Sequence, residues 1–255
     1  MGRLLGVSFA GVDSRTNIER LVTIHENAPS KDFVEYGLLL SKHWYENGNR
    51  YFYPELLDAF EDTGLNLCGH LCGSIAREAV AGNWEPFMEL VGEHIHLFNR
   101  LQLNIANYRS SNPERLKITP PEPVKEVIIQ QKAAYDCKLF YEWHLKHPGD
   151  RSLSILIDGS GGRGISKDII PLYGIEKVGY AGGVNPENVA SKASALLRDN
   201  AVSDFWIDME SGVRTDDWFD VGKVEAVIET VKKTMESMRP DMKADLSEFY
   251  PNFKC

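Results

Sequence analysis

Paired glycines and small polar residues near two apolar runs have spacings that indicate an anion-binding function. Gly182 and Gly183 end the apolar run 177–183, and Ser211 and Gly212 follow the next run, 204–210. Glycines let backbone amides approach a ligand closely, and a helix start that follows them carries partial positive charge. We expect these four residues to bind a phosphate group or a similar anion. The alternative is that the glycines only serve tight turns.

Cysteine and histidine alternate along an earlier apolar segment, residues 66–72. The two-residue period of a strand puts Cys68, His70 and Cys72 on one face, so His70 or Cys72 could supply a catalytic base near the strand end. Neighbours on such a face lie about 6.5 Å apart, too far for one compact zinc site, and we expect no metal. Packing of all three in the protein interior is the alternative.

Asp158 ends a third apolar run, 152–158, directly before the glycine-rich segment 159–164. A carboxyl group at such a position can lose contact with water and keep its proton, which suits a general acid. The alternative is an aspartate that caps a turn or forms an ion pair.

The elements that must position these residues alternate along the chain. Short apolar runs predict eight strands, at residues 4–10, 33–41, 66–72, 100–106, 124–130, 152–158, 177–183 and 204–210. Apolar spacing near 3.6 predicts helices between and after them, at residues 16–27, 54–63, 75–96, 135–147, 186–199 and 221–238. A proline at position 186, after Asn185, is typical of a helix start.

Eight strands that are mostly followed by helices predict an α/β fold, a (β/α)₈ TIM barrel in a single domain over residues 1–239. Residues 240–255 form an acidic and aromatic C-terminal tail. An open, doubly wound sheet is the alternative fold. In a barrel the functional site lies at the C-terminal ends of the strands, where the residues above would meet.

The net charge of the chain narrows the classes of molecule that it is expected to bind. The 255 residues include 28 Lys and Arg against 37 Asp and Glu, a net charge of −9, which disfavours nucleic acid as a partner. We find no run long enough to span a membrane and no signal peptide, and four cysteines are too few for a disulfide scaffold. We therefore expect a cytoplasmic protein without membrane attachment. The sequence leaves open whether the protein forms a homo-oligomer.

The last third of the chain resembles phosphoribosylanthranilate isomerase. Residues 182–189 read Gly-Gly-Val-Asn-Pro-Glu-Asn-Val, similar to the Gly-Gly-Leu-Asn-Pro-Glu-Asn segment of that family. Residues 207–213 read Ile-Asp-Met-Glu-Ser-Gly-Val, similar to the family's Val-Asp-Val-Ser-Ser-Gly-Val. Residues 156–158, 50–55 and 101–104 are similar to its Leu-Leu-Asp, Arg-Tyr-Ile-Ser-Pro-Glu and Val-Gln-Leu-His segments.

The resemblance implies roles for several residues. The family isomerises a phosphorylated aminoribose with an aspartate as general acid and a cysteine as general base, and Asp158 matches the acid. Arg50 matches the residue that holds the anthranilate carboxylate, a task suited to a guanidinium group. Gln102 and Asn104 match the family's Gln and His on the fourth strand, which implies contact with the substrate. No cofactor is implied.

Three positions depart from the family pattern. Ala10 stands where the family has its catalytic cysteine, Asn104 replaces the histidine, and Glu210 replaces a serine near the phosphate. We therefore expect a protein that binds or acts on a small phosphorylated sugar by acid–base proton transfer, of the aldose–ketose isomerase type, but not by the family's standard reaction. The alternatives are an inactive phosphosugar-binding or regulatory protein, and an enzyme resembling ribulose-phosphate epimerase.

Overall fold

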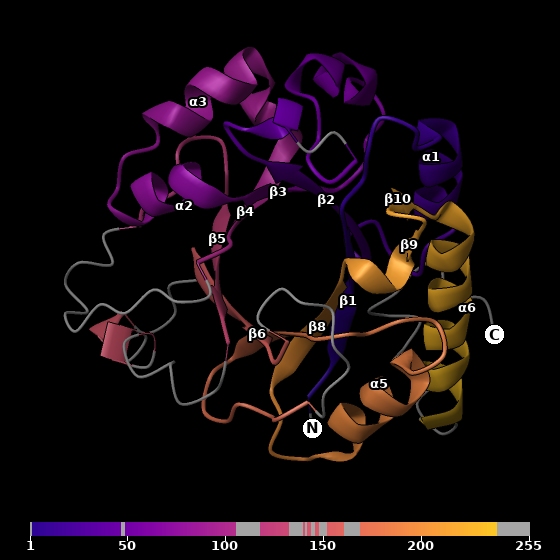
Figure 1. Ribbon diagram of the computed structural model, residues 1–255. Coiled ribbons are helices and arrows are strands. Elements are labelled where there is room, and N and C mark those ends of the chain that lie inside the picture. The colour runs from indigo at the N-terminus through magenta and orange to yellow at the C-terminus, as the bar shows by residue number, and fades with distance from the viewer. Residues whose placement is uncertain are drawn as a thin grey trace.

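A computed structural model describes residues 2–46, 49–105, 118–132, 140, 142–143, 146–147, 152–160 and 169–238. Its centre is a closed barrel of eight parallel strands in chain order, with β1 paired to β8 (Figure 1). The strands are β1 (Leu4–Ala10), β2 (Val34–Leu40), β3 (Leu67–Leu71), β4 (Phe98–Leu103), β5 (Glu126–Gln131), β6 (Leu153–Asp158), β7 (Lys177–Ala181) and β8 (Asp204–Met209). The predicted α/β fold, a single-domain (β/α)₈ barrel, is confirmed, and the open sheet is excluded.

Helices surround the strands (Figure 1). They are α1 (Ile18–Glu26), α2 (Gly73–Val80), α3 (Glu85–Val91), α5 (Val189–Arg198) and α6 (Val221–Met238), with 3₁₀ helices at Trp44–Glu46, Pro54–Phe60, Gly92–Leu97 and Ser211–Val213. A short hairpin of β9 (Arg214–Thr215) and β10 (Trp218–Phe219) precedes α6. Among the described residues, no helix has both the length and the apolar composition needed to cross a membrane.

Two predicted helices differ from those observed. The single helix expected over 75–96 is divided into α2, α3 and the 3₁₀ helix that follows, because Gly82 and Gly92 adopt positive φ angles of 85° and 56°. The helix expected over 54–63 is a 3₁₀ helix. Most of the helix expected over 135–147 and the tail 240–255 lie outside the described residues.

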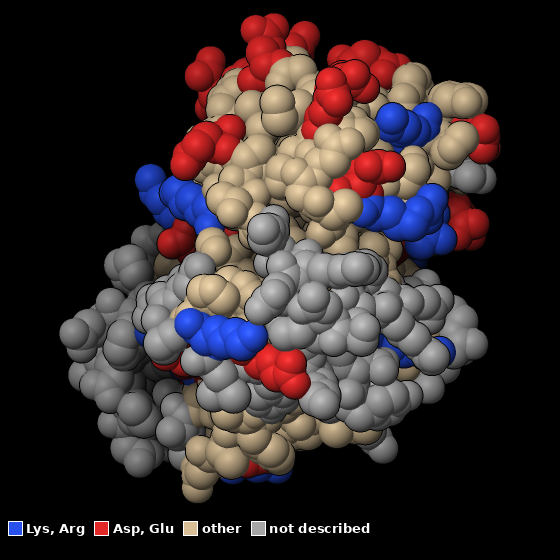
Figure 2. All heavy atoms as spheres, turned by 90° about the vertical axis from the view of Figure 1, so that its left-hand side faces the viewer, with Lys and Arg blue, Asp and Glu red and all other residues tan. Residues whose placement is uncertain are grey.

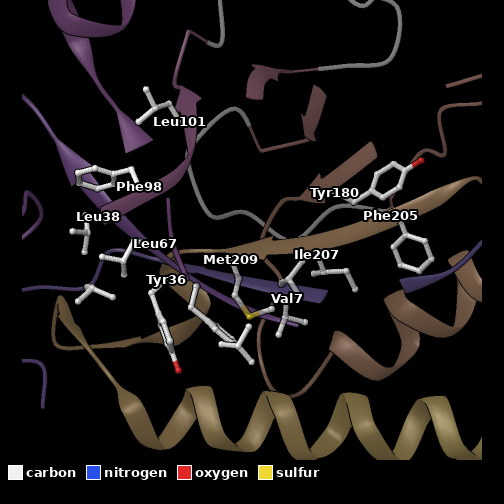
Figure 3. Packing of buried hydrophobic residues seen from close by; sticks show 14 of the residues in the cluster. Val7, Tyr36, Leu38, Leu67, Phe98, Leu101, Tyr180, Phe205, Ile207 and Met209 are labelled. Atoms are coloured by element: carbon white, nitrogen blue, oxygen red, sulfur yellow. The ribbon is translucent and has the colours of Figure 1, made fainter. Parts of the chain in front are cut away.

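Two groups of apolar side chains hold the barrel. Figure 3 shows the larger one, between the strands and the helices, where Tyr36 and neighbouring side chains point toward the long helix α6. A smaller cluster inside the barrel consists of Cys68, Ile128, Leu156 and Trp206. The alternation of strand side chains places polar residues two positions before and after this cluster, at the two ends of the barrel. The inner cluster therefore separates two polar regions.

Acidic side chains dominate part of the surface. In Figure 2, Asp and Glu side chains gather on the upper part of the face shown, on the side of the molecule where Figure 1 places α2 and α3. This distribution agrees with the net charge of −9.

Candidate functional site

A polar cavity of about 440 Å³ lies at the C-terminal ends of the strands. Its inner walls come from seven strands, through Ala10 on β1, His70 on β3, Gln102 on β4, Gln130 on β5, Asp158 on β6, Ala181 on β7 and Asp208 on β8. The loops after β7 and β8 complete its rim. This is the end of a barrel at which catalytic groups from different strands converge.

Eight of the ten predicted site residues line this cavity. They are Arg50, His70, Gln102, Asn104, Asp158, Gly182, Gly183 and Ser211. Cys72 lies just behind the wall, against Asn104. Gly212 packs instead against the loop after β7, where an added Cβ would lie 1.8 Å from the carbonyl oxygen of Val184. Close backbone packing accounts for glycine at position 212.

A hydrogen-bonded row connects β3 and β4. Gln102 donates from Nε2 to Nδ1 of His70 at 3.2 Å and to Oδ1 of Asn104 at 3.0 Å. Asn104 in turn donates to Sγ of Cys72 at 3.3 Å. The strand pairing explains the row, because His70 and Gln102 are direct partners across β3 and β4. The proton of neutral His70 is therefore assigned to Nε2.

The surroundings of His70 and Cys72 argue against either as a base at neutral pH. Burial lowers the pKa of His70 to about 4, and its acceptor nitrogen is already occupied by Gln102. Burial also raises the pKa of Cys72 to about 11, partly offset by the hydrogen bond from Asn104. A thiol that keeps its proton is a poor nucleophile and a poor base. His70 instead forms part of one wall of the cavity, and Cys72 supports that wall from behind through Asn104.

Asp158 is buried and accepts three hydrogen bonds. Gln130 donates from Nε2 to Oδ2 at 2.8 Å, and Ser160 donates to Oδ1 from its backbone nitrogen at 2.9 Å and from Oγ at 2.7 Å. These contacts fix the orientation of the carboxyl group at the end of β6. Because each of them is donated to Asp158, the side chain is arranged as a proton acceptor.

Asp208 occupies a different electrostatic environment at the end of β8. Burial raises the pKa of Asp208 to about 8, and the charges of Glu35, Asp158 and Glu210 add to this effect, while the Ser8 hydroxyl opposes it. Its Oδ1 has no hydrogen-bond partner among the described residues. At neutral pH Asp208 therefore holds a proton that it can give to a ligand. Sequence reasoning placed this residue in a motif but gave it no role.

The loop after β7 is held in one conformation beside Asp158. Gly182 and Gly183 have positive φ angles of 118° and 59°, which few residues other than glycine adopt. An added Cβ on Gly182 would lie 3.6 Å from Oδ1 of Asp158. Asn185 and Asn188 each accept a hydrogen bond from the other's backbone nitrogen at 3.0 Å. Helix α5 begins only at Val189, so Pro186 lies in this capped turn.

Arg50 lies at the rim and forms an ion pair with Glu210. Its Nη2 is 3.5 Å from Oε1 of Glu210, and the Arg50 side chain is 54% exposed. The ion pair offsets the negative charge that Glu210 brings next to the predicted anion site. An incoming carboxylate or phosphate would compete with Glu210 for this guanidinium group.

Arg214 is a cavity residue that the sequence reasoning missed. Its Nη1 donates to the carbonyl oxygen of Gly11 at 2.7 Å, its Nη2 donates to the carbonyl oxygens of Asn49 and Asp217, and it lies 3.7 Å from Oδ2 of Asp13. The residue thus ties the loops after β1, β2 and β8 together. No linear motif signals this role, because the partners meet only when the barrel closes.

Within the described part of the chain, no three His, Cys, Asp or Glu side chains are grouped so that they could hold a metal ion. The chemistry that the cavity itself offers is proton transfer and hydrogen bonding, with carboxyl groups, amides and two arginines as the working groups.

Comparison with known proteins supports the fold. No family model matches the sequence, and no curated protein matches it. Among solved structures, N-(5'-phosphoribosyl)anthranilate isomerase from Pyrococcus furiosus is similar with a TM-score of 0.53 at 18% identity, over 90% of this chain and 99% of that chain. The phosphoribosyl anthranilate isomerase from Thermococcus kodakaraensis has a TM-score of 0.50 at 18% identity, over 89% and 99%.

A third similar structure is the phospho-2-dehydro-3-deoxyheptonate aldolase from Thermotoga maritima, with a TM-score of 0.50 at 11% identity, over 92% of this chain and 70% of that chain. At these identities the similarity shows a shared barrel fold. It does not show a shared reaction, which must be inferred from the residues of the cavity.

Proposed function

We propose that this barrel catalyses proton transfer on a small phosphorylated sugar, in the manner of an aldose–ketose isomerisation. The observation that carries the proposal is a pair of buried carboxyl groups in one cavity with opposite arrangements. Asp158 accepts three hydrogen bonds, whereas burial raises the pKa of Asp208 to about 8. Two carboxyl groups whose environments differ in this way are suited to act as base and acid.

The proposed step conserves protons. Asp208 gives its proton to the carbonyl oxygen of the open-chain sugar, while Asp158 takes a proton from the neighbouring carbon, which leaves an enediol intermediate. The proton on Asp158 is then given to the former carbonyl carbon, and the hydroxyl proton on the other oxygen of the enediol goes to Asp208, which completes the isomerisation and restores both carboxyl groups. This assignment gives Asp158 the role of base, in place of the acid role that the family resemblance implies.

The glycine loop and Arg50 support the choice of a phosphorylated substrate. Gly182 lies beside Asp158, and Gly183 and Ser211 line the same cavity, so we expect their backbone amides to bind an anion next to the reacting atoms. A phosphate held there would place the sugar chain over the two carboxyl groups. The solved isomerases that resemble this barrel carry the phosphoribosyl group in their names.

A phosphosugar-binding protein without turnover is the second candidate, and Ala10 is the observation that favours it. Its methyl group lines the cavity at the position where the resemblance would put the catalytic cysteine. For the same reason we expect phosphoribosylanthranilate itself to be turned over at no more than a background rate.

The test is a thermal-shift screen with pentose and hexose phosphates, followed by ¹H NMR in D₂O on each sugar that stabilises the protein. We expect at least one sugar phosphate to bind more tightly than inorganic phosphate and to exchange the hydrogen next to its carbonyl carbon for deuterium. Asp158→Asn is expected to keep binding and lose exchange. Binding without exchange would favour the second candidate, and the absence of any binding would refute both.

A further inference from the structure

Gln130 on β5 lines the candidate active site, and sequence reasoning assigned it no role. It pairs with Leu156 across β5 and β6, so Asp158, two positions further along β6, lies on the same face of the barrel wall. Nε2 of Gln130 donates a hydrogen bond to Oδ2 of Asp158 at 2.8 Å. An ionised carboxylate only accepts hydrogen bonds, which assigns this end of the amide as the nitrogen. Gln130 therefore holds the proposed base with its nitrogen and keeps its oxygen for another partner.

The oxygen of Gln130 is open to the cavity. Oε1 accepts no hydrogen bond from a described residue, although Gln130 is only 8% exposed. Oε1 retains some accessible surface, which faces the cavity that Gln130 lines. Buried polar groups usually have a partner, and an amide oxygen can only accept a hydrogen bond. A ligand that fills the cavity must therefore present a donor to Gln130.

Gln102 repeats this arrangement on the neighbouring strand β4. Its Nε2 donates to His70 and Asn104, which uses both N–H groups, while Oε1 accepts no hydrogen bond from a described residue. Gln102 is 3% exposed and lines the same cavity. The wall formed by β4 and β5 thus presents two amide oxygens, which match the hydroxyl groups of a sugar. A phosphate group has mainly acceptor oxygens, so it does not suit this wall and is expected at the loops after β7 and β8.

The proposed isomerisation identifies the hydroxyl group that would contact Gln130. Asp208 exchanges protons with the oxygens on the first two carbons of the sugar, and Asp158 takes its proton from the second carbon. The C3 hydroxyl is the first one that the reaction leaves unchanged. Since Nε2 and Oε1 belong to one amide group, an atom that contacts Oε1 must lie close to the carbon that Asp158 deprotonates. The C3 hydroxyl meets both conditions.

We propose that Oε1 of Gln130 accepts a hydrogen bond from the C3 hydroxyl of the substrate, while Nε2 positions Asp158 for proton transfer at C2. This inference rests on the proposed function and narrows its substrate to aldose phosphates with a free C3 hydroxyl. A 3-deoxy sugar would bury the Gln130 oxygen without a donor, and a site built to contact a hydroxyl group discriminates against such an analogue. Gln130 is thus a positioning residue for Asp158 and a determinant of specificity.

The test compares an aldose phosphate that binds in the thermal-shift screen with its 3-deoxy analogue. The analogue keeps the phosphate, the carbonyl group and the hydrogen on C2, so its binding and its deuterium exchange can both be measured. Calorimetry gives the two dissociation constants, and ¹H NMR in D₂O gives the two exchange rates. We expect the wild type to bind the analogue at least about tenfold more weakly than the sugar.

A matched pair of variants on β5 locates the contact. In Gln130→Met, the two dissociation constants should lie within about threefold of each other, and exchange of the sugar should fall at least about tenfold because Asp158 has lost a hydrogen bond. Gln131→Met is the control, since Gln131 is also 8% exposed but lies on the opposite face of β5 and does not line the cavity. This control should keep the wild-type preference and exchange rate.

If Gln130→Met does not fold, the comparison of the two sugars in the wild type decides alone. Equal affinity of the wild type for the sugar and its analogue, or a preference that survives in Gln130→Met, would overturn the inference. Exchange without a preference would refute the hydroxyl contact and leave the proposed function standing. A preference in binding without exchange would support the hydroxyl contact and refute the proposed function. The absence of binding by every aldose phosphate would refute both.

Discussion

Nε2 of Gln102 lies 3.2 Å from Nδ1 of His70 and donates a hydrogen bond to it. This contact leaves the His70 proton on Nε2, which points toward Gly37 and has no partner among the described residues. His70 is thus a neutral, fixed part of the cavity wall. For this reason our proposal assigns the acid–base role to the carboxyl groups of β6 and β8 and not to β3.

Gly37→Ala should destabilise the protein. An added Cβ would lie 2.7 Å from Nε2 of His70 and 3.0 Å from the Cα of Ala10, so one wall of the cavity must shift. We expect a loss of about 1–3 kcal/mol in the free energy of unfolding, measured by urea denaturation. In the His70→Ala background, Gly37→Ala should lower the free energy of unfolding by less than it does in the wild type, because the clashing imidazole is absent. Full wild-type stability in the single variant would contradict the packing described.

Gly183→Ala should weaken phosphosugar binding at least tenfold, about 1.4 kcal/mol, because its φ angle of 59° and its place beside the anion site both require glycine. Gly64→Ala is the matched control. Gly64 has a similar φ angle of 67° and no atom within 4 Å of an added Cβ, so it has comparable strain away from the cavity. Calorimetry with a sugar phosphate found in the screen measures both. Equal affinities would place the phosphate elsewhere.

Arg214→Met should loosen three loops at once. The variant leaves Asp13, whose side chain is fully buried, without its ion-pair partner, and it removes donors to Gly11, Asn49 and Asp217. We expect a loss of about 2–4 kcal/mol in stability and weaker ligand binding. Arg20→Met, which breaks the exposed pair with Glu225, should cost less than about 1 kcal/mol. Similar losses in the two variants would argue against the role assigned to Arg214.

Asp208 should make stability depend on pH. Its pKa is about 8 in the folded protein against an ordinary value of 3.8, so the folded state holds a proton that the unfolded chain releases. Unfolding is therefore favoured as the pH rises from about 4 to about 8, and the Asp208 contribution to stability falls by up to about 1.4 kcal/mol per pH unit across that window. Above pH 8 this contribution no longer changes.

Urea denaturation between pH 5 and 8 tests this dependence. Asp208→Asn should flatten the stability profile over the window, whereas Asp62→Asn, at an exposed position, should leave it as in the wild type. A profile that Asp208→Asn does not alter would show that the Asp208 side chain is ionised in the folded protein.

The fold could be predicted because the apolar periodicity of each segment matches the strand or helix that the segment forms in the barrel. The helix expected over 221–238 is found as Val221–Met238, and each of the eight expected strands lies within two or three residues of an observed one. The division of the segment 75–96 was missed because its apolar spacing continues through Gly82 and Gly92, although both glycines were visible as possible helix ends.

From the sequence, only those site residues could be predicted that lie in a recognisable strand or directly after one. Asp158 and the glycines of the loop after β7 were identified because each lies at the end of an apolar run, and His70 because cysteine and histidine alternate along residues 66–72. The raised pKa of Asp208 results first from burial inside the closed barrel and then from the charges of Glu35 and Asp158, which belong to other strands. Arg214 likewise acts on loops that are distant in the sequence. Such relationships arise from closure of the barrel and have no signature in one segment.

The measurement that tests the central claim most directly is deuterium exchange into a bound sugar phosphate by the wild type and by Asp208→Asn, with affinity measured in parallel. The substituted amide would keep the shape of the side chain but could not give up a proton as a carboxylic acid does. We predict that exchange falls by about 10²- to 10⁴-fold while the dissociation constant stays within about threefold. Exchange at the wild-type rate in Asp208→Asn would contradict the assignment of Asp208 as the acid.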